Sequence, residues 1–361
     1  MPMIFSFFSG IGMLDNAFEE EGFEVVYSSE IYKPFLDGYK HVRKSLSLPE
    51  PMFGYHMEDI RSLKTGTHIK RIGRLLGAAK KLDLVGFIGG PPCPDFSVGG
   101  KNLGRYGPNG HLSKVYVDLI SIHQPDFFVF ENVKGLWKTQ RHRVFYEELK
   151  KQLENSGYAL ADRLVNSLEF GAPQDRDRVI LVGIRRELVC ASLLDFAWTS
   201  KVLHDKKKTL ALPWPTKNPP SRERHQAEGI PVELTVNHWF KRNIVTEHPN
   251  SGDAFLPRAG LNRFIETWEG DTSRKSFKRL HRWRYSPTAA YGNNEVHIHP
   301  WEPRRISVAE ALAIQSAPAS FSLPQDMSLT AMFKGIGNAV PYLLGKGIAS
   351  PLHQLLKASD H

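Results

Sequence analysis

Cysteine is scarce in this sequence, and long apolar runs are absent. Two cysteines among 361 residues, Cys93 and Cys190, cannot build a disulfide framework, so we expect a protein of the reducing cytoplasm. The most apolar runs, 84–88 and 127–130, have the length of strands and fall far short of the roughly 18 residues that a membrane helix needs. The first residues carry no basic stretch ahead of an apolar one, so we expect no signal peptide.

Acidic residues are outnumbered. Lysine and arginine total 47 against 38 aspartates and glutamates, which gives a net charge of +9 and favours a polyanionic partner such as nucleic acid. The content of 41% hydrophobic and 24% charged residues is typical of a folded protein and excludes disorder as the main state. Internal repeats are missing as well, which excludes a solenoid.

The first 185 residues alternate between short apolar runs and helical patterns. Strands are expected at 4–8, 24–29, 82–88, 126–130, 158–165 and 179–184. Helices are expected at 13–21, 33–45, 114–122 and 143–155. Strands that are apolar on both faces and separated by helices predict an α/β fold with a doubly wound, mostly parallel, Rossmann-like sheet.

This rhythm is lost after residue 186, where a proline-rich segment at 212–220 and scattered tryptophans and histidines follow. We therefore expect residues 187–300 to form a smaller, irregular domain. Periodic structure returns at Ser307, which together with Glu310 forms a capping box, and Pro341 suits a first helical position. Residues 301–361 are thus predicted to return to the domain that residues 1–186 begin.

Residue types that carry chemistry follow four of the predicted strands. A tight turn with Gly10 and Gly12 follows the first strand, and Glu30 follows the second. Cys93 follows the strand at 82–88, and Glu131 follows the strand at 126–130. Because the carboxyl ends of parallel strands meet at one edge of a sheet, we expect these groups to lie close together.

The turn lacks the third glycine of the dinucleotide fingerprint, which disfavours a nicotinamide dehydrogenase. An adenosine-type cofactor without phosphates fits better, with its ribose hydroxyls held by Glu30. Asp59, after a short strand expected near 55–58, could accept a hydrogen bond from the adenine amine. Cys93 follows two glycines and two prolines, where a packing role is improbable, and we interpret it as a nucleophile.

Four motifs occur in order: Gly90-Pro-Pro-Cys-Pro-Asp-Phe-Ser97, Glu131-Asn-Val133, Gln174-Asp-Arg-Asp-Arg178 and Gly337-Asn-Ala-Val-Pro341. In these motifs the chain resembles the DNA cytosine-C5 methyltransferases of bacterial restriction–modification systems, over nearly its whole length except about 190–285. The resemblance implies S-adenosylmethionine as cofactor and a flipped-out cytosine in double-stranded DNA as substrate. It also implies a target-recognition domain at 187–300, a monomer without a membrane segment, and room for a paired restriction endonuclease.

Carried over by position, the resemblance makes Cys93 the nucleophile and Glu131 the acid that holds the cytosine ring nitrogen. Arg178 would reach the cytosine carbonyl oxygen, with Arg176 beside it. The implied cofactor contacts are Phe8, Gly10, Gly12, Glu30, Asp59, Ile60, Pro92, Asn338 and Val340. No metal is expected. The chain departs from the family at Ser6, where an acid is frequent, and at Pro94, where glutamine is usual.

The chemistry suits these residue types. A thiolate that adds to carbon 6 of cytosine makes carbon 5 reactive toward a methyl sulfonium. The charge that develops at the ring nitrogen is relieved by a carboxyl group, and burial at the end of an apolar strand should raise the pKa of Glu131 for that role. The sequence does not identify the base that later removes the carbon 5 proton.

Basic residues supply candidate DNA contacts in two places. The glycine-containing segment 96–110 is expected to close over the flipped base, with Ser97, Lys101 and Arg105 as contacts. The segment 274–284 holds six basic residues and no acidic one, and its expected phosphate contacts are Arg274, Lys275, Lys278, Arg279, Arg282 and Arg284. No residues of a catalytic or metal-binding motif accompany Cys190 in the sequence, and we interpret it as structural.

Two other functions remain open at this point. A tRNA cytosine-C5 methyltransferase would use the same scaffold and motifs, although the basic middle segment favours duplex DNA. A non-catalytic DNA-binding relative would not need Cys93, Glu131 and Arg178, all of which are present.

Overall fold

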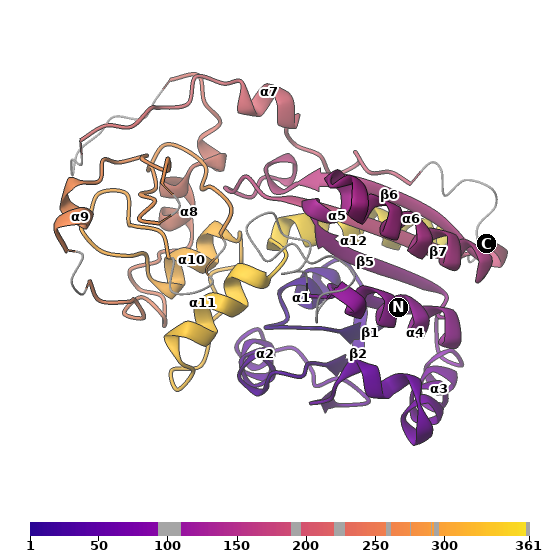
Figure 1. Cartoon of the computed structure of the whole chain (residues 1–361). Helices are drawn as coiled ribbons and strands as arrows, with labels where there is room; N and C mark the ends of the chain where they lie inside the picture. Colours follow the sequence, from indigo (N-terminus) through magenta and orange to yellow (C-terminus); the bar gives the residue numbers. More distant parts are fainter. Residues whose placement is uncertain are drawn as a thin grey trace.

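The computed structural model describes residues 1–92, 110–188, 196–219, 228–257, 261–274, 276–289, 291 and 296–358. Its centre is a sheet of seven strands in the order β3-β2-β1-β4-β5-β7-β6 (Figure 1). The strands are β1 (Met3–Phe7), β2 (Glu24–Ser29), β3 (Tyr55–His56), β4 (Val85–Gly89), β5 (Phe127–Val133), β6 (Tyr158–Asn166) and β7 (Asp177–Arg185).

The strands β1 to β5 pair in parallel, and β7 runs antiparallel to both of its neighbours, β5 and β6. The predicted α/β fold with a mostly parallel sheet is confirmed. The position of β7 between β5 and β6 was not expected, because apolar runs predict strands but not the order in which they pair.

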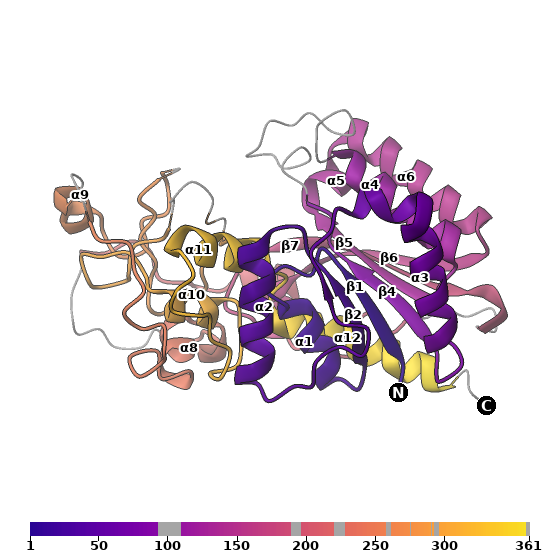
Figure 2. The same cartoon turned by 90° about the horizontal axis from the view of Figure 1, so that it is seen from below.

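Helices cover both faces of the sheet (Figure 2). On one face, α3 (Gly66–Ala79), α4 (Gly110–His123), α5 (Lys134–Lys138) and α6 (Gln140–Asn155) surround a core that includes Phe5, Phe87 and Phe128. On the other face, α1 (Met13–Glu20) and α12 (Tyr342–Ala358) pack on Ile4, Ile88 and neighbouring residues. The sequence did not predict helix α3, whereas α2 (Lys33–Ser45) has the bounds that were predicted for it. Burial on both faces explains why the central strands are apolar throughout.

The described part of residues 187–300 adds no strand to the sheet and lies beside it (Figure 1). Its helices are α7 (Lys206–Leu210), α8 (Val236–Arg242) and α9 (Leu261–Glu266). Short 3-10 helices lie at Ile60–Lys64, Ser167–Phe170, Arg186–Leu188 and Val232–Leu234. Trp239 and Phe240 of α8 share a core with residues of α10 (Val308–Ile314) and α11 (Leu329–Asn338), so this segment is anchored to the C-terminal part of the chain.

The C-terminal helices begin close to where the sequence places them. The Ser307 hydroxyl accepts a hydrogen bond from the Glu310 amide at 3.2 Å, and the Glu310 carboxylate accepts one from the Ser307 amide at 2.7 Å, which confirms the capping box. The last helix begins at Tyr342, directly after Pro341. No helix in the described ranges is long and apolar enough to cross a membrane.

Candidate active site

The carboxyl ends of β1, β2, β4 and β5 meet at one edge of the sheet, because these strands are parallel. Phe8, Glu30 and Gly90 each come directly after a strand at this edge, and Glu131 lies near the end of β5. The structure therefore brings the predicted glycine turn, the first acid and the second acid to one rim.

The turn after β1 has the backbone that a close ligand approach requires. Phe8, Gly10 and Gly12 all have positive φ angles, of 55°, 57° and 82°. A Cβ at Gly12 would lie 2.1 Å from the Tyr39 ring, so only glycine fits there, whereas a Cβ at Gly10 would meet no atom of the described residues within 4 Å. Among the described residues the space above Gly10 is thus open, as a bound cofactor requires.

Glu30 is fixed against this turn. Its carboxylate accepts hydrogen bonds from the Gly10 amide at 3.0 Å and from the Tyr32 amide at 2.8 Å. Burial raises the pKa of Glu30, and the two amide hydrogen bonds oppose that rise. A carboxylate held beside an open glycine turn suits a pair of ribose hydroxyls.

The other predicted cofactor residues are placed less uniformly. The Asp59 carboxylate accepts from the Arg61 amide at 2.8 Å and pairs with the Arg61 guanidinium, which lowers the pKa of Asp59. Ile60 and Val340 are buried, whereas Asn338 at the end of α11 and Pro92 are exposed.

Glu131 and Arg178 form a buried ion pair on adjacent strands. Arg178 is opposite Val133 in the antiparallel ladder of β5 and β7, and its Nε lies 2.7 Å from Oε1 of Glu131. Burial raises the pKa of Glu131, as predicted, while the positive charges of Arg178 and Arg176 act in the opposite direction. The two groups that would hold a cytosine ring therefore already face each other.

The segment that leads to Cys93 passes directly against this pair. A Cβ at Gly90 would lie 2.6 Å from Oε2 of Glu131, so a side chain there would displace the carboxylate. Sequence reasoning treated Gly90 only as part of a motif and missed this contact. The predicted residues Cys93, Ser97, Lys101 and Arg105, the departure at Pro94, and Cys190 lie outside the described residues.

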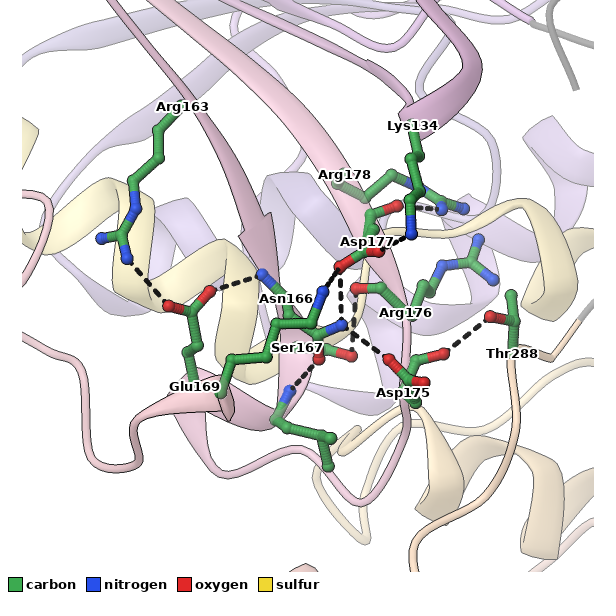
Figure 3. Close-up of polar contacts among 12 residues, drawn as sticks. Lys134, Arg163, Asn166, Ser167, Glu169, Asp175, Arg176, Asp177, Arg178 and Thr288 are labelled. Atoms are coloured by element: carbon green, nitrogen blue, oxygen red, sulfur yellow. Dashed lines mark hydrogen bonds and ion pairs between the residues drawn. The ribbon is translucent and has the colours of Figure 1, made fainter. Parts of the chain in front are cut away.

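Arg176, which is predicted to act beside Arg178, binds backbone carbonyl groups in this structure. Its buried guanidinium donates to the carbonyl oxygens of Ala289 at 3.0 Å, Gly337 at 2.7 Å and Ala339 at 3.0 Å. Figure 3 shows that the side chains of Arg176 and Arg178 come from the same strand end. Arg176 thus ties the start of β7 to the backbone around Asn338, and its part in holding the substrate stays a prediction.

Gln174, which begins the same motif, was not predicted as a site residue. It is fully buried, accepts from the Ala289 amide at 2.9 Å and donates to Oε1 of Gln315 at 2.9 Å. Its place two residues before Arg176 was the signal. Together the two side chains fasten the segment 174–178 to both the middle segment and the C-terminal helices.

Two arginines of the basic segment are buried, contrary to the predicted phosphate contacts. Arg279 is 1% exposed, and its guanidinium donates to the carbonyl oxygens of His299 at 2.8 Å, Glu302 at 2.9 Å and Phe264. Arg282 is 5% exposed and binds both carboxylate oxygens of Glu269, at 2.8 and 3.0 Å. A guanidinium is tolerated inside a protein when carbonyls or a carboxylate meet its donors, and these two groups cannot reach a phosphate here.

The other basic residues of this segment stay available. Arg274 is exposed, Lys278 and Arg284 are partly exposed, and Lys275 lies outside the described residues. Arg274 borders a hollow of about 310 Å³ that is also lined by Lys217, Arg263 and the half-exposed Trp268. A second hollow, of about 400 Å³, lies between α8 and Trp283. In Figure 2, α9 and α5 lie in the upper half of the view, and α8 lies in the lower half.

Within the described ranges, no group of three or more histidines, cysteines, aspartates or glutamates could hold a metal ion.

The chain belongs to the C-5 cytosine-specific DNA methylase family, whose model matches residues 3–354, and it is thus a DNA cytosine-5 methyltransferase. It is 52% identical, over 98% of its length and 84% of the relative's, to the type II methyltransferase M.NmeDI of Neisseria meningitidis serogroup C.

Solved structures share the fold. A putative DNA modification methyltransferase encoded within an E. coli prophage covers 99% of both chains, with a TM-score of 0.67 and 22% identity. A variant of Spodoptera frugiperda DNMT2 covers 99% of this chain and 100% of its own, with a TM-score of 0.60 and 19% identity. At these identities the likeness concerns the fold alone.

Proposed function

We propose that this methyltransferase acts on a cytosine within a specific sequence of double-stranded DNA and uses S-adenosylmethionine as donor. The observation that carries the proposal is the buried ion pair of Glu131 and Arg178. Gly90, three residues before Cys93, packs directly against the Glu131 carboxylate of this pair. A ring nitrogen and a ring carbonyl oxygen on one edge of a base match a carboxyl group and a guanidinium placed side by side.

The chain's own residues divide the work. The Cys93 thiolate adds to carbon 6, the Glu131 carboxyl relieves the charge at the ring nitrogen, and Arg178 holds the carbonyl oxygen. The raised pKa of Glu131 suits a group that must share a proton with the ring. A base within a stacked duplex cannot reach this rim, so the cytosine is flipped out, at a cost of a few kcal/mol.

The rim also fits the donor. S-adenosylmethionine supplies a methyl group activated on a sulfonium. Glu30 would hold its ribose hydroxyls beside the open turn of Phe8, Gly10 and Gly12. Asp59 and Ile60 would meet its adenine, and Pro92, Asn338 and Val340 would line the rest of the site.

Residues 187–300 form the recognition part in this proposal, and residues 1–186 with 301–361 form the catalytic part. Arg274, Lys275, Lys278 and Arg284 would bind phosphates, with Ser97, Lys101 and Arg105 close to the flipped base. The enzyme would act as a cytoplasmic monomer that protects sites cut by a paired restriction endonuclease.

Bisulfite sequencing of plasmid DNA from cells that express the protein tests this directly. We expect protected cytosines at one position of one short sequence, and none in cells that express Cys93→Ser. Purified protein with labelled S-adenosylmethionine should then methylate duplex DNA and not tRNA. Transfer to tRNA alone would replace the proposal with the tRNA alternative, and no transfer to either would favour a binding protein.

A further inference from the structure

Asp177, which lies next to Arg178, joins three separate elements. Its carboxylate contacts Lys134 at the start of α5 at 2.6 Å and Lys206 at the start of α7 at 2.5 Å. It also accepts a hydrogen bond from the side-chain amide of Asn166, at the end of β6, at 2.7 Å. The side chain of Asp177 is 9% exposed. Burial alone would raise the pKa of Asp177, but the three partners outweigh it and lower the pKa, so the group stays charged.

These contacts close the ladder in which the two substrate-binding groups sit. Val133 of β5 is opposite Arg178 of β7, and the pair of Lys134 and Asp177 continues that ladder by one step. On the other side of β7, Asp177 is directly opposite Asn166. Asp177 thus fastens β7 to both of its neighbours at the strand end that carries Arg178 (Figure 3).

Asp177 does not face the base itself. Neighbouring residues of a strand point to opposite faces of the sheet. The side chain of Asp177 therefore lies on the face opposite to the one that carries Arg178 and Glu131. Its backbone is the link to the site, because the Asp177 carbonyl accepts from Nη1 of Arg178 at 2.8 Å. The guanidinium of Arg178 is therefore held between this carbonyl and the Glu131 carboxylate.

The same strand end is attached to the middle segment of the chain. Lys206 comes from that segment, and the Asp175 carbonyl accepts from the Thr288 hydroxyl at 2.7 Å. Asn166 connects the two acids, because its amide also donates to Asp175 at 2.7 Å (Figure 3). Contacts from the proposed recognition part thus end one residue and three residues from Arg178, at Asp177 and Asp175.

We propose that Asp177, with Asn166 and Lys134 as its partners, is a positioning residue that holds Arg178 and Glu131 in register for capture of the flipped cytosine. An isolated surface ion pair would not carry this role, since water and salt screen such pairs and they contribute little to stability. Here one nearly buried carboxylate bridges three elements, and its removal leaves two ammonium groups close together. The inference rests on the proposed function, since it concerns how that site is held.

Asp177→Asn tests the role, with Asp126→Asn as the matched control. Asp126 directly precedes β5, at the end of that strand far from Glu131. Its carboxylate contacts Lys80 at 2.7 Å and accepts a hydrogen bond from the Val85 amide at 2.8 Å. Asp177→Asn removes the carboxylate charge that pairs with two lysines, and Asp126→Asn removes the one that pairs with Lys80, but only Asp177 is next to the site. Each would be measured for single-turnover methyl transfer, for affinity for DNA and S-adenosylmethionine, and for melting temperature.

We expect Asp177→Asn to lower the single-turnover rate by about 10- to 100-fold, in line with a small displacement of reacting groups, with both affinities within about threefold of wild type. Asp126→Asn should keep the wild-type rate, whatever its melting temperature. Lys134→Met, at a half-exposed side chain, provides a second route if Asp177→Asn does not fold, and it should slow the same step. In the double variant the two losses should not add, because they break one junction.

An unchanged rate in Asp177→Asn, or in Lys134→Met where the first variant does not fold, would overturn the inference. Equal rate losses in Asp177→Asn and Asp126→Asn would also overturn it, because they would reflect stability alone. Wild-type protein that transfers no methyl group would instead refute the proposed function, so the two failures are distinct.

Discussion

Gly90 shows at the scale of one residue how tightly the site is built. Because its Cβ would lie 2.6 Å from the Glu131 carboxylate, Gly90→Ala must displace that group or the chain that leads to Cys93. We predict that Gly90→Ala lowers the methyl-transfer rate by about 100-fold, the loss typical of a misplacement of about 1 Å. The control is Gly77→Ala within α3, where a Cβ would meet no atom of the described part of the chain within 4 Å. It should keep full activity and raise the melting temperature slightly, and a comparable activity loss there would contradict the argument.

Asp15 lies beside Ser6, the position at which the chain departs from the family pattern. The Ser6 hydroxyl donates to the Asp15 carboxylate at 2.9 Å, and Tyr39 donates to it at 2.8 Å, so an acid from α1 reaches the strand position where the family often carries one. Burial raises the pKa of Asp15 from 3.8 to about 6, and the hydrogen bonds from Ser6 and Tyr39 only partly oppose this.

A raised pKa means that the folded state holds the proton more tightly than the unfolded state. The stability that comes from the protonated group is therefore complete below about pH 4 and is lost as the pH rises through about 6. We predict that wild type loses about 3 kcal/mol of unfolding free energy relative to Asp15→Asn over this range. Urea unfolding of both proteins from pH 4 to 7 measures the difference, and parallel pH profiles would contradict the prediction.

At the scale of elements, the segment 274–284 combines outward and inward arginines. Arg282→Ala would leave the fully buried Glu269 carboxylate without its guanidinium, so we predict a loss of roughly 3 kcal/mol or more in unfolding free energy. Arg274→Ala, at an exposed position, should leave stability unchanged and lower the salt slope of DNA binding by about one unit. Thermal melts and binding titrations at several salt concentrations separate the two. An unchanged unfolding free energy in Arg282→Ala would contradict the buried ion pair of Arg282 with Glu269.

Elements with a strong local pattern could be predicted from the sequence, and those set by long-range pairing could not. The apolar runs predict β2 and β5 to within a few residues, and the capping box at Ser307 predicts the start of α10. The antiparallel place of β7 depends on partners far away in the chain. Burial of Arg279 depends on carbonyl groups of residues 264, 299 and 302, which no local pattern of charge reveals.

The candidate site divides in the same way. Glu30 and Glu131 could be placed at the sheet edge because each follows an apolar strand, and the rise in the pKa of Glu131 follows from that burial. The contact of Gly90 with Glu131 and the three carbonyl partners of Arg176 require coordinates, because they join segments far apart in the chain.

At the scale of the whole molecule, we assign recognition and chemistry to different parts of the chain. The described part of residues 187–300 lies beside the sheet, and the predicted catalytic groups among the described residues lie on the sheet itself (Figure 1). We predict that transplanting residues 187–300 into a cytosine-C5 methyltransferase of different specificity moves the methylated sequence with them. Bisulfite sequencing identifies that sequence, and an active chimera that keeps its old sequence would contradict the division.

The central claim is covalent capture of a cytosine by Cys93 with help from Glu131. The most direct measurement uses duplex DNA that carries 5-fluorocytosine at the methylated position, together with S-adenosylmethionine. Fluorine replaces the proton that must leave carbon 5, so the adduct accumulates and can be seen on a denaturing gel, and peptide mass mapping identifies the attached residue. Cys93→Ser should form no adduct, and Glu131→Gln should form it slower by about two to four powers of ten, with DNA binding kept in both. A crosslink at another residue, or full turnover by Cys93→Ser, would contradict the account.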